Sequence, residues 1–219
     1  MSTSRLKRNK KQDYLNQTFS SHHTLLNKIT QETKKESVLH MQISSHEGRL
    51  LEFLVKLSKA KKIVEIGTLY AYSTFYLARA IPKGGKVWSL DSCLKRHKKC
   101  KEIFKNSNLK EKIEWLTGPA KESLELIKTK APFDAVFIDA DKESYLDYLK
   151  WAKAHLKQGG LLIADNTFLF GSVYGEPEKK CKPETLKVMR EFNKALANLS
   201  FWQGALIPTL EGMTVGIKL

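Results

Sequence analysis

The stretch Val64-Glu65-Ile66-Gly67-Thr68-Leu69-Tyr70-Ala71-Tyr72-Ser73 decides the fold of this chain. It begins as a short apolar strand, turns at a glycine, and continues into a helix that we expect from about Tyr72 to Ala80. A strand, a tight turn and a helix form half of a βαβ unit, so the stretch predicts a parallel sheet. The glycine also lets a ligand approach the backbone closely.

Short apolar strands recur after this stretch and are separated by helical segments. They lie at 87–90, 113–116, 135–138 and 161–164. Strands that alternate with helices predict an α/β fold, here a Rossmann-like, doubly wound and mainly parallel sheet with helices on both faces. Segments 201–207 and 213–219 are also strand-like, and we expect them to form an antiparallel hairpin at one edge, completing a seven-stranded sheet.

The amino-terminal third is organised differently. Apolar residues scattered over 13–35 predict one or two amphipathic helices, and Ser44-Ser45-His46-Glu47 has the spacing of a capping box before a helix at about 45–58. We therefore expect a basic helical segment over 1–40 and a single domain over 41–219. A long loop at 167–182 is a candidate lid or substrate loop.

Composition narrows the classes of protein. The chain has 219 residues, of which 42% are hydrophobic, which excludes a disordered chain and fits one α/β domain. It contains no apolar run long enough for a membrane helix and no apolar run behind its basic start, so we expect a cytoplasmic protein without a membrane partner. Its three cysteines lack the spacing of a disulfide framework or a zinc site.

The chain is strongly basic, with 38 Lys and Arg against 23 Asp and Glu and a net charge of +15. Basic runs at 1–11 and 95–101 raise the hypothesis of a nucleic-acid partner, because cations that neutralise phosphates drive such binding. The remaining charge is dispersed. Composition alone therefore favours a solvated helix face and a basic tail.

Acidic residues gather at or near the carboxyl ends of the predicted strands. Glu65 lies in the first strand, Asp91 ends the second, Asp139 the fourth and Asp165 the fifth. Ligands of doubly wound sheets bind beyond these strand ends, and carboxylates gathered there repel one another unless cations or hydroxyl-rich ligands lie among them. The turn lacks the glycines of a GxGxxG motif, which disfavours a nicotinamide or flavin cofactor. Asp91 can still accept hydrogen bonds from ribose hydroxyls.

Asp139, Asp165 and Asn166 are three oxygen donors at the ends of two strands that we expect to be neighbours. Oxygen ligands select a hard cation, and few protein ligands with room for water and substrate favour Mg²⁺, with Mn²⁺ or Ca²⁺ as alternatives. Lys142 follows Asp139 by three residues, so its amine can face a hydroxyl held at such a cation.

Several motifs in order resemble the class I S-adenosylmethionine-dependent methyltransferases, in particular the cation-dependent O-methyltransferase family of the catechol and caffeoyl-CoA O-methyltransferases. The resemblance runs from about Met41 to the carboxyl terminus. The motifs are Met41-Gln42-Ile43-Ser44, residues 64–73, Gly85-Lys86-Val87 with Asp91, Gly118-Pro119-Ala120, residues 133–142, and Gly159-Gly160 before Asp165-Asn166-Thr167.

The resemblance implies a role for each matching position. S-adenosyl-L-methionine would be the cofactor, with Ser73 on its carboxylate, Asp91 on its ribose and Ala120 on its adenine; the full set of cofactor-binding positions is Ile43, Glu65, Gly67, Thr68, Ser73, Asp91, Ala120 and Asp141. The family's metal ligands match Asp139, Asp165 and Asn166, and its general base matches Lys142. A homodimer is also implied.

Three motifs depart from the family pattern, one of them the Gly-Asp-Gly common near the end of the family, in place of which this chain has Thr209-Leu210-Glu211-Gly212. Ala71 stands where the family usually has glycine, and its methyl group would shift the turn slightly. Relatives that act on caffeoyl-type substrates carry Trp-Asn before the glycine of the loop after the metal ligands, whereas this chain has Leu169-Phe170. Phe168 and Phe170 therefore either line an aromatic pocket or pack in the interior.

Our leading hypothesis is methyl transfer to a hydroxyl of a vicinal diol or catechol-type small molecule, with Lys142 removing the proton. A second hypothesis keeps the reaction and changes the acceptor to a hydroxylated tRNA nucleoside of the 5-hydroxyuridine type, because the chain is so basic. A third is a non-catalytic basic binding module, which the presence of the three oxygen donors and Lys142 disfavours.

Overall fold

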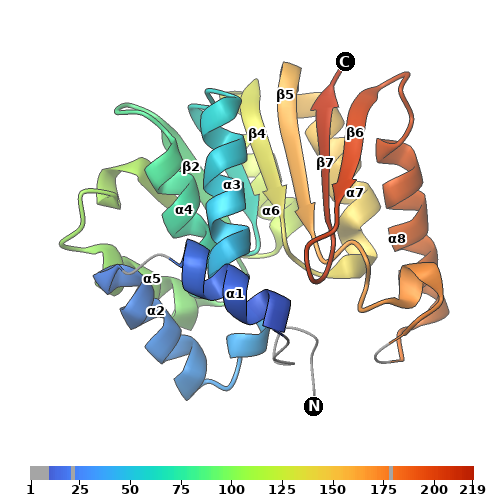
Figure 1. Ribbon diagram of the computed structural model, residues 1–219. Coiled ribbons are helices and arrows are strands. Elements are labelled where there is room, and N and C mark those ends of the chain that lie inside the picture. The colour runs from blue at the N-terminus through green and yellow to red at the C-terminus, as the bar shows by residue number, and fades with distance from the viewer. Residues whose placement is uncertain (1–9, 21–22, 178–179) are drawn as a thin grey trace.

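A seven-stranded sheet forms the centre of the molecule (Figure 1), with strand order β3-β2-β1-β4-β5-β7-β6. A computed structural model describes residues 10–20, 23–177 and 180–219. The basic residues before Lys10 lie outside the described residues, so the structure does not test a role for that tail. The strands are β1 Lys62–Ile66, β2 Lys86–Asp91, β3 Ile113–Thr117, β4 Phe133–Ile138, β5 Leu156–Asp165, β6 Trp202–Ile207 and β7 Met213–Lys218.

Strands β1 to β5 pair in parallel, whereas β7 runs antiparallel to both β5 and β6. The predicted α/β fold and its edge hairpin are therefore confirmed. In β1, Ile63 packs into one core cluster and Val64 and Ile66 pack into the other, so both sides of this strand are covered. Covered faces on both sides are typical of parallel sheets.

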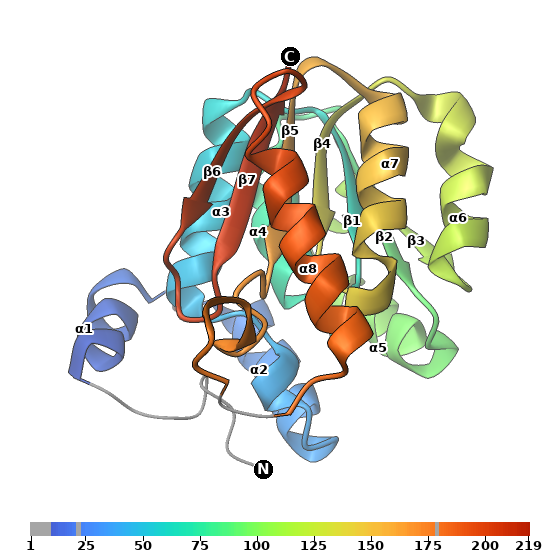
Figure 2. The same cartoon turned by 90° about the vertical axis from the view of Figure 1, so that its right-hand side faces the viewer.

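Among the residues that the structure describes, three helices cover each face of the sheet, and Figure 2 shows α3 and α4 on one side of it and α7 and α8 on the other. The first face carries α3 Ser45–Leu57, α4 Tyr72–Ala80 and α5 Leu94–Phe104, and the second carries α6 Ala120–Ile127, α7 Tyr145–His155 and α8 Pro183–Leu196. Helix α4 has the predicted bounds, and α3 ends one residue before the predicted end.

Two further helices, α1 Lys10–Phe19 and α2 Thr24–Lys35, lie beside the end of the sheet at which the parallel strands finish (Figure 1). Leu25, Leu26 and Ile29 of α2 are buried in the same core cluster as α3 and α4. The remaining helical elements are short 3-10 turns at Leu39–Met41, Lys110–Lys112, Lys128–Lys130, Lys142–Ser144 and Ser172–Tyr174. No helix within the described residues is both long and apolar enough to cross a membrane.

The sheet has its topological switch point between β1 and β4. From β1 the chain proceeds outward through β2 to β3, and it then returns to the other side of β1 to form β4. Connections from β1 and β4 therefore leave toward opposite faces and open a crevice beyond the two strand ends. Gly67 follows β1 and Asp139 follows β4, so this crevice lies between two of the predicted site residues.

Candidate active site

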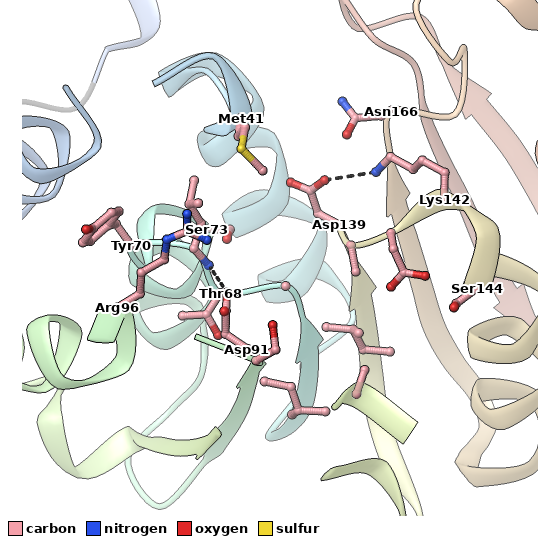
Figure 3. Close-up of a pocket in the computed structure, with 18 of the residues that line it drawn as sticks. Met41, Thr68, Tyr70, Ser73, Asp91, Arg96, Asp139, Lys142, Ser144 and Asn166 are labelled. Carbon is pink, nitrogen blue, oxygen red and sulfur yellow. Dashed lines mark hydrogen bonds and ion pairs between the residues drawn. The ribbon is translucent and has the colours of Figure 1, made fainter. Parts of the chain in front are cut away.

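A cavity of about 950 Å³ opens beyond the carboxyl ends of the central strands (Figure 3). This volume is within the range of sites that hold a cofactor or a drug-sized ligand. All but two of the predicted site residues line it: Ile43, Gly67, Thr68, Ser73, Asp91, Ala120, Asp139, Asp141, Lys142 and Asn166. The two exceptions, Glu65 and Asp165, are fully buried.

Gly67 makes the turn that brings the two central strand ends together. Its φ of +103° is in the region that disfavours side chains, and a Cβ built on it would lie 2.0 Å from the carbonyl oxygen of Asp139. The backbone N–H of Asp139 donates to the carbonyl of Ile66 at 2.9 Å, which fixes the end of β4 against the turn. Only glycine fits this contact between two backbones.

Asp91 presents a carboxylate that the backbone holds in place. Its Oδ2 accepts from the N–H of Leu69 at 2.8 Å, and its Oδ1 accepts from the N–H of Cys93 at 2.8 Å. Each carboxylate oxygen can accept further hydrogen bonds, so Asp91 has acceptor capacity left for a diol in the cavity. This arrangement fits the predicted contact with ribose hydroxyls.

Ala71 adopts the left-handed backbone conformation, with φ +67° and ψ +31°, at the start of α4. This conformation explains why the family uses glycine at the matching position, because a Cβ there costs roughly 1–2 kcal/mol. The Ala71 side chain is nevertheless fully buried in the core cluster. The turn is therefore formed here by an alanine in a conformation that favours glycine.

Glu65 is set behind the cavity wall, on the side of β1 that faces α4. It accepts hydrogen bonds from Ser73, Thr74 and Ser89 at 2.5–2.6 Å. Burial is the largest influence on this carboxyl and raises its pKa to about 7, against the opposing effect of the three hydroxyl donors. Glu65 does not itself line the cavity, and the structure places the cavity-lining Ser73 against its carboxylate.

The other end of the cavity holds Asp139, Lys142 and Asn166 (Figure 3). The Lys142 amine lies 3.4 Å from Asp139 Oδ1 and donates to the Tyr145 hydroxyl at 2.6 Å. That hydroxyl donates in turn to the carbonyl oxygen of Asp165 at 2.8 Å. Tyr145, which the sequence analysis missed, therefore links Lys142 to the end of β5.

The donors at this end of the cavity fit a hard cation. Strands β4 and β5 are neighbours as predicted, with Ile138 opposite Ala164, so Asp139 and Asp165 follow adjacent strand ends. Asp139 and Asn166 offer oxygen atoms at the cavity wall, and oxygen donors suit Mg²⁺. The described residues contain no group of three His, Cys, Asp or Glu side chains able to hold a metal ion, but the predicted set includes an asparagine and is not such a group.

Asp141 also lines the cavity. Burial is the largest influence and raises its pKa, but hydrogen bonds from Ser144 and Tyr148 together outweigh burial and lower the pKa below the usual value. The Tyr148 hydroxyl donates to Asp141 Oδ1 at 2.6 Å. An anionic Asp141 suits a cationic ligand group, such as the amino group that the resemblance implies.

Arg96 is a cavity residue that the sequence analysis assigned to a solvated helix face. Its Nε lies 3.3 Å from Glu36, which also pairs with Lys95 at 2.9 Å. The hydrogen bond from Lys95 is the main cause that lowers the pKa of Glu36 to about 2. Within the basic run His97 is buried, so the run is only partly solvated. The helical spacing of His97, Cys100 and Phe104 was the available signal for this buried face.

The two phenylalanines of the loop after β5 have different roles. Phe170 lines the cavity, with its backbone at a φ of +53°. Phe168 packs edge-on against Tyr174, with ring centroids 5.2 Å apart, and lies against Gly212, where a Cβ would come within 2.7 Å of its ring. Of the two phenylalanines, Phe170 is therefore the one positioned to contact a ligand in the cavity.

Comparison with known proteins identifies the family. Residues 16–219 match the sequence model of a family described as O-methyltransferase. A catechol O-methyltransferase of Niastella koreensis is 37% identical over 138 residues, which are 62% of this chain and 62% of that protein, less than two thirds of its length. A caffeoyl-CoA O-methyltransferase of Medicago sativa is 32% identical over 205 residues, 90% of this chain and 83% of that protein.

Solved structures share the whole architecture. The O-methyltransferase TomG of Streptomyces achromogenes, in complex with SAM, superposes with a TM-score of 0.86 at 26% identity, over 100% of this chain and 99% of that one. An O-methyltransferase of Bacillus cereus in complex with SAH gives 0.85 at 27% identity, over 94% and 96%. The fold, the cavity and the match over residues 16–219 show that this chain belongs to the O-methyltransferase family.

Proposed function

We propose that this chain is a cation-dependent O-methyltransferase that transfers a methyl group from S-adenosylmethionine to one hydroxyl of a vicinal diol or catechol-type small molecule. One observation carries the proposal. A single cavity brings together Asp91 and Ser73, which suit the cofactor, with Asp139, Lys142 and Asn166, which suit a cation and a hydroxyl.

The cofactor would lie along the β1 and β2 side of the cavity. Asp91 would accept hydrogen bonds from the ribose hydroxyls, and Gly67 would let the ligand approach the backbone. Asp141 would attract the amino group, while Ile43 and Ala120 would contact the methionyl and adenine parts. Bound there, S-adenosylmethionine supplies an electrophilic methyl group.

Asp139, Asp165 and Asn166 would hold the cation. When bound, a divalent cation lowers the pKa of a hydroxyl that coordinates it and orients that hydroxyl. Lys142 would remove the proton, and it must be neutral to do so. Tyr145 fixes the position of the Lys142 amine, and the cavity walls hold the acceptor oxygen in line with the methyl group.

The acceptor class is tested by methyl transfer from labelled S-adenosylmethionine to catechol and, in parallel, to bulk tRNA. Labelling of catechol without labelling of tRNA supports the proposal. Labelling of tRNA alone would overturn the small-molecule acceptor and favour the RNA hypothesis that the net charge of +15 raises. Guaiacol, in which one of the two hydroxyls is already methylated, serves as the matched control and should remain unlabelled.

A further inference from the structure

Glu65 forms the centre of a buried cluster of hydroxyl groups beneath the cavity wall. Its Oε1 accepts from Ser73 at 2.6 Å, and its Oε2 accepts from Thr74 and Ser89, each at 2.5 Å. Glu65 and its partners are nine-tenths or more buried, and Ser73 is the member that also lines the cavity. The two carboxyl oxygens thus differ: Oε1 meets the cavity-lining hydroxyl, whereas Oε2 meets two interior ones.

A serine hydroxyl has one proton, so the charge of Glu65 decides what Ser73 offers to a ligand. While Glu65 is ionised, Ser73 donates to Oε1 and presents lone pairs to the cavity. Ser73 lies in the first turn of α4, however, where the positive end of the helix favours an anionic group. An anionic group placed there would face the lone pairs of the hydroxyl and would lack its proton.

We propose that Glu65 takes up one proton when an anionic ligand group binds at Ser73, and that this reverses the hydrogen bond between the two side chains. The inference rests on the proposed function, in which that group is the carboxylate of the cofactor. The proton comes from the solvent buffer and binds to Oε1. Oε1 then donates to Ser73, Ser73 donates to the ligand carboxylate, and the bonds from Thr74 and Ser89 to Oε2 are unchanged. Glu65 is therefore a positioning residue that acts through Ser73.

The surroundings of Glu65 allow this exchange near neutral pH. Its pKa is raised to about 7, chiefly by burial and in the same direction by Asp139 at the end of β4, against the three hydroxyl donors. From α5, burial lowers the pKa of His97 and raises the pKa of the Cys100 thiol, so both are neutral near pH 7. From β2, Asp91 acts to raise the pKa of both His97 and Cys100, and from β4 Asp139 disfavours a negative charge at Glu65.

A hydrogen-bonded chain also joins Glu65 to the surface. Ser89 contacts Thr68 at 2.7 Å, and Thr68 contacts the Nε2 of His97 at 3.1 Å. The Nδ1 of His97 contacts the hydroxyl of Thr117 at 2.7 Å, and Thr117 is exposed. Because Ser89 donates to Glu65, it accepts from Thr68, which in turn accepts from His97 Nε2–H. The buried carboxyl is thus connected to solvent through groups that can each donate and accept.

The test is calorimetric titration of the protein with S-adenosylhomocysteine at pH 8, in phosphate and in Tris, whose ionisation enthalpies differ. The difference between the binding enthalpies measured in the two buffers gives the number of protons taken up per bound ligand. We expect about one proton per bound ligand for the wild type and an affinity that falls about tenfold per pH unit above pH 7. 5′-Methylthioadenosine, which lacks the carboxylate, should bind without this uptake.

Glu65→Gln is the decisive variant, because its amide can donate to Ser73 without a proton from solvent. It should bind S-adenosylhomocysteine without proton uptake and with an affinity independent of pH. Any ionisation of the ligand's own amino group contributes equally to the wild type and the variant, so it cancels in the comparison. Glu114→Gln, at an exposed position of β3, is the matched control and should behave as the wild type. If Glu65→Gln does not fold, Ser73→Ala serves instead and should abolish the uptake while 5′-methylthioadenosine still binds.

Two results would overturn the inference: binding of S-adenosylhomocysteine to the wild type without proton uptake at pH 8, or uptake that persists in Glu65→Gln or Ser73→Ala. Failure of the wild type to bind either ligand at any pH from 6 to 9 is a different result. It would refute the proposed function itself, and this inference with it.

Discussion

At the scale of single residues, the sequence predicted which residues lie near the cavity better than it predicted what each of them contacts. Asp91, Asp139 and Lys142 line the cavity as predicted, because the ends of parallel strands meet at one edge of a sheet. Glu65, predicted beside the cofactor, does not line the cavity and lies against the cavity-lining Ser73. Strand alternation alone puts residue 65 on the same face as Ile63, which is an interior face, so this burial could have been read from the pattern.

Gly67 is the residue whose replacement the structure tolerates least. We expect Gly67→Ala to destabilise the protein by at least about 2 kcal/mol, since the new methyl group meets the backbone of Asp139 at 2.0 Å. Gly84→Ala is the matched control, because Gly84 also has a positive φ, +81°, but nothing lies within 4 Å of its Cβ position. It should cost only about 1 kcal/mol. Denaturant unfolding measures both, and equal losses would contradict the steric argument.

Glu65 should also leave a signature in the pH dependence of stability. Its folded pKa of about 7 lies above the unfolded value of 4.5, so the folded state holds this proton more tightly. The resulting stabilisation is fully present below pH 4.5 and is lost as the pH rises through 7, by about 3 kcal/mol in total. The free energy of unfolding of the wild type, compared with that of Glu65→Gln, should therefore fall across this window. A constant difference between the two would refute the raised pKa.

Tyr145 should matter for turnover and not for cofactor binding. Its hydroxyl joins the Lys142 amine to the carbonyl of Asp165, and the residue is not among those that line the cavity. Tyr145→Phe removes both bonds, each involving a buried or charged group, so we expect kcat to fall roughly 10- to 100-fold. The Kd for S-adenosylhomocysteine should change less than about twofold. A loss of affinity as large as the loss of turnover would show that Tyr145 does not act through Lys142.

At the scale of elements, patterns of residues close together in the sequence predicted most helices and strands. The glycine turn predicted α4 and the capping box predicted α3, because both depend on residues adjacent in sequence. Strand β5 begins at Leu156, five residues before its predicted start, since pairing with β4 carries it past Gly159 and Gly160. The pairing of Glu36 with Lys95 and Arg96, which joins α2 to α5, is a contact between distant segments that no local pattern encodes.

The capping box of α3 offers a test at this scale. Ser44 accepts from the N–H of Glu47 at 3.2 Å, and the Glu47 carboxylate accepts from the N–H of Ser44 at 2.8 Å. Ser44→Ala should lower the free energy of unfolding by about 1 kcal/mol, whereas Ser44→Asp, another good helix cap, should restore most of it. Thermal or denaturant unfolding of the three proteins decides the matter. Equal stability of the alanine and aspartate variants would show that the side-chain cap contributes nothing.

At the scale of the whole molecule, the amino-terminal segment and the sheet enclose one site. Thr33 and His40 from the segment line the same cavity as Asp91 and Asp139 from the strand ends. The sequence predicted helices in this segment but not where they pack, because an amphipathic pattern gives the buried face and not its partner. The net charge of +15 likewise did not show where the cations lie, and Arg96 of the basic run turns out to line the cavity.

The central claim is that the cavity joins a cofactor end to a cation-dependent acceptor end. The most direct test is methyl transfer from labelled S-adenosylmethionine to catechol by protein stripped of metal with EDTA, before and after Mg²⁺ is restored. We predict loss of labelling on stripping, recovery with Mg²⁺, and no recovery in Asp139→Ala, while S-adenosylhomocysteine still binds the variant. Undiminished labelling of catechol in EDTA would contradict the account.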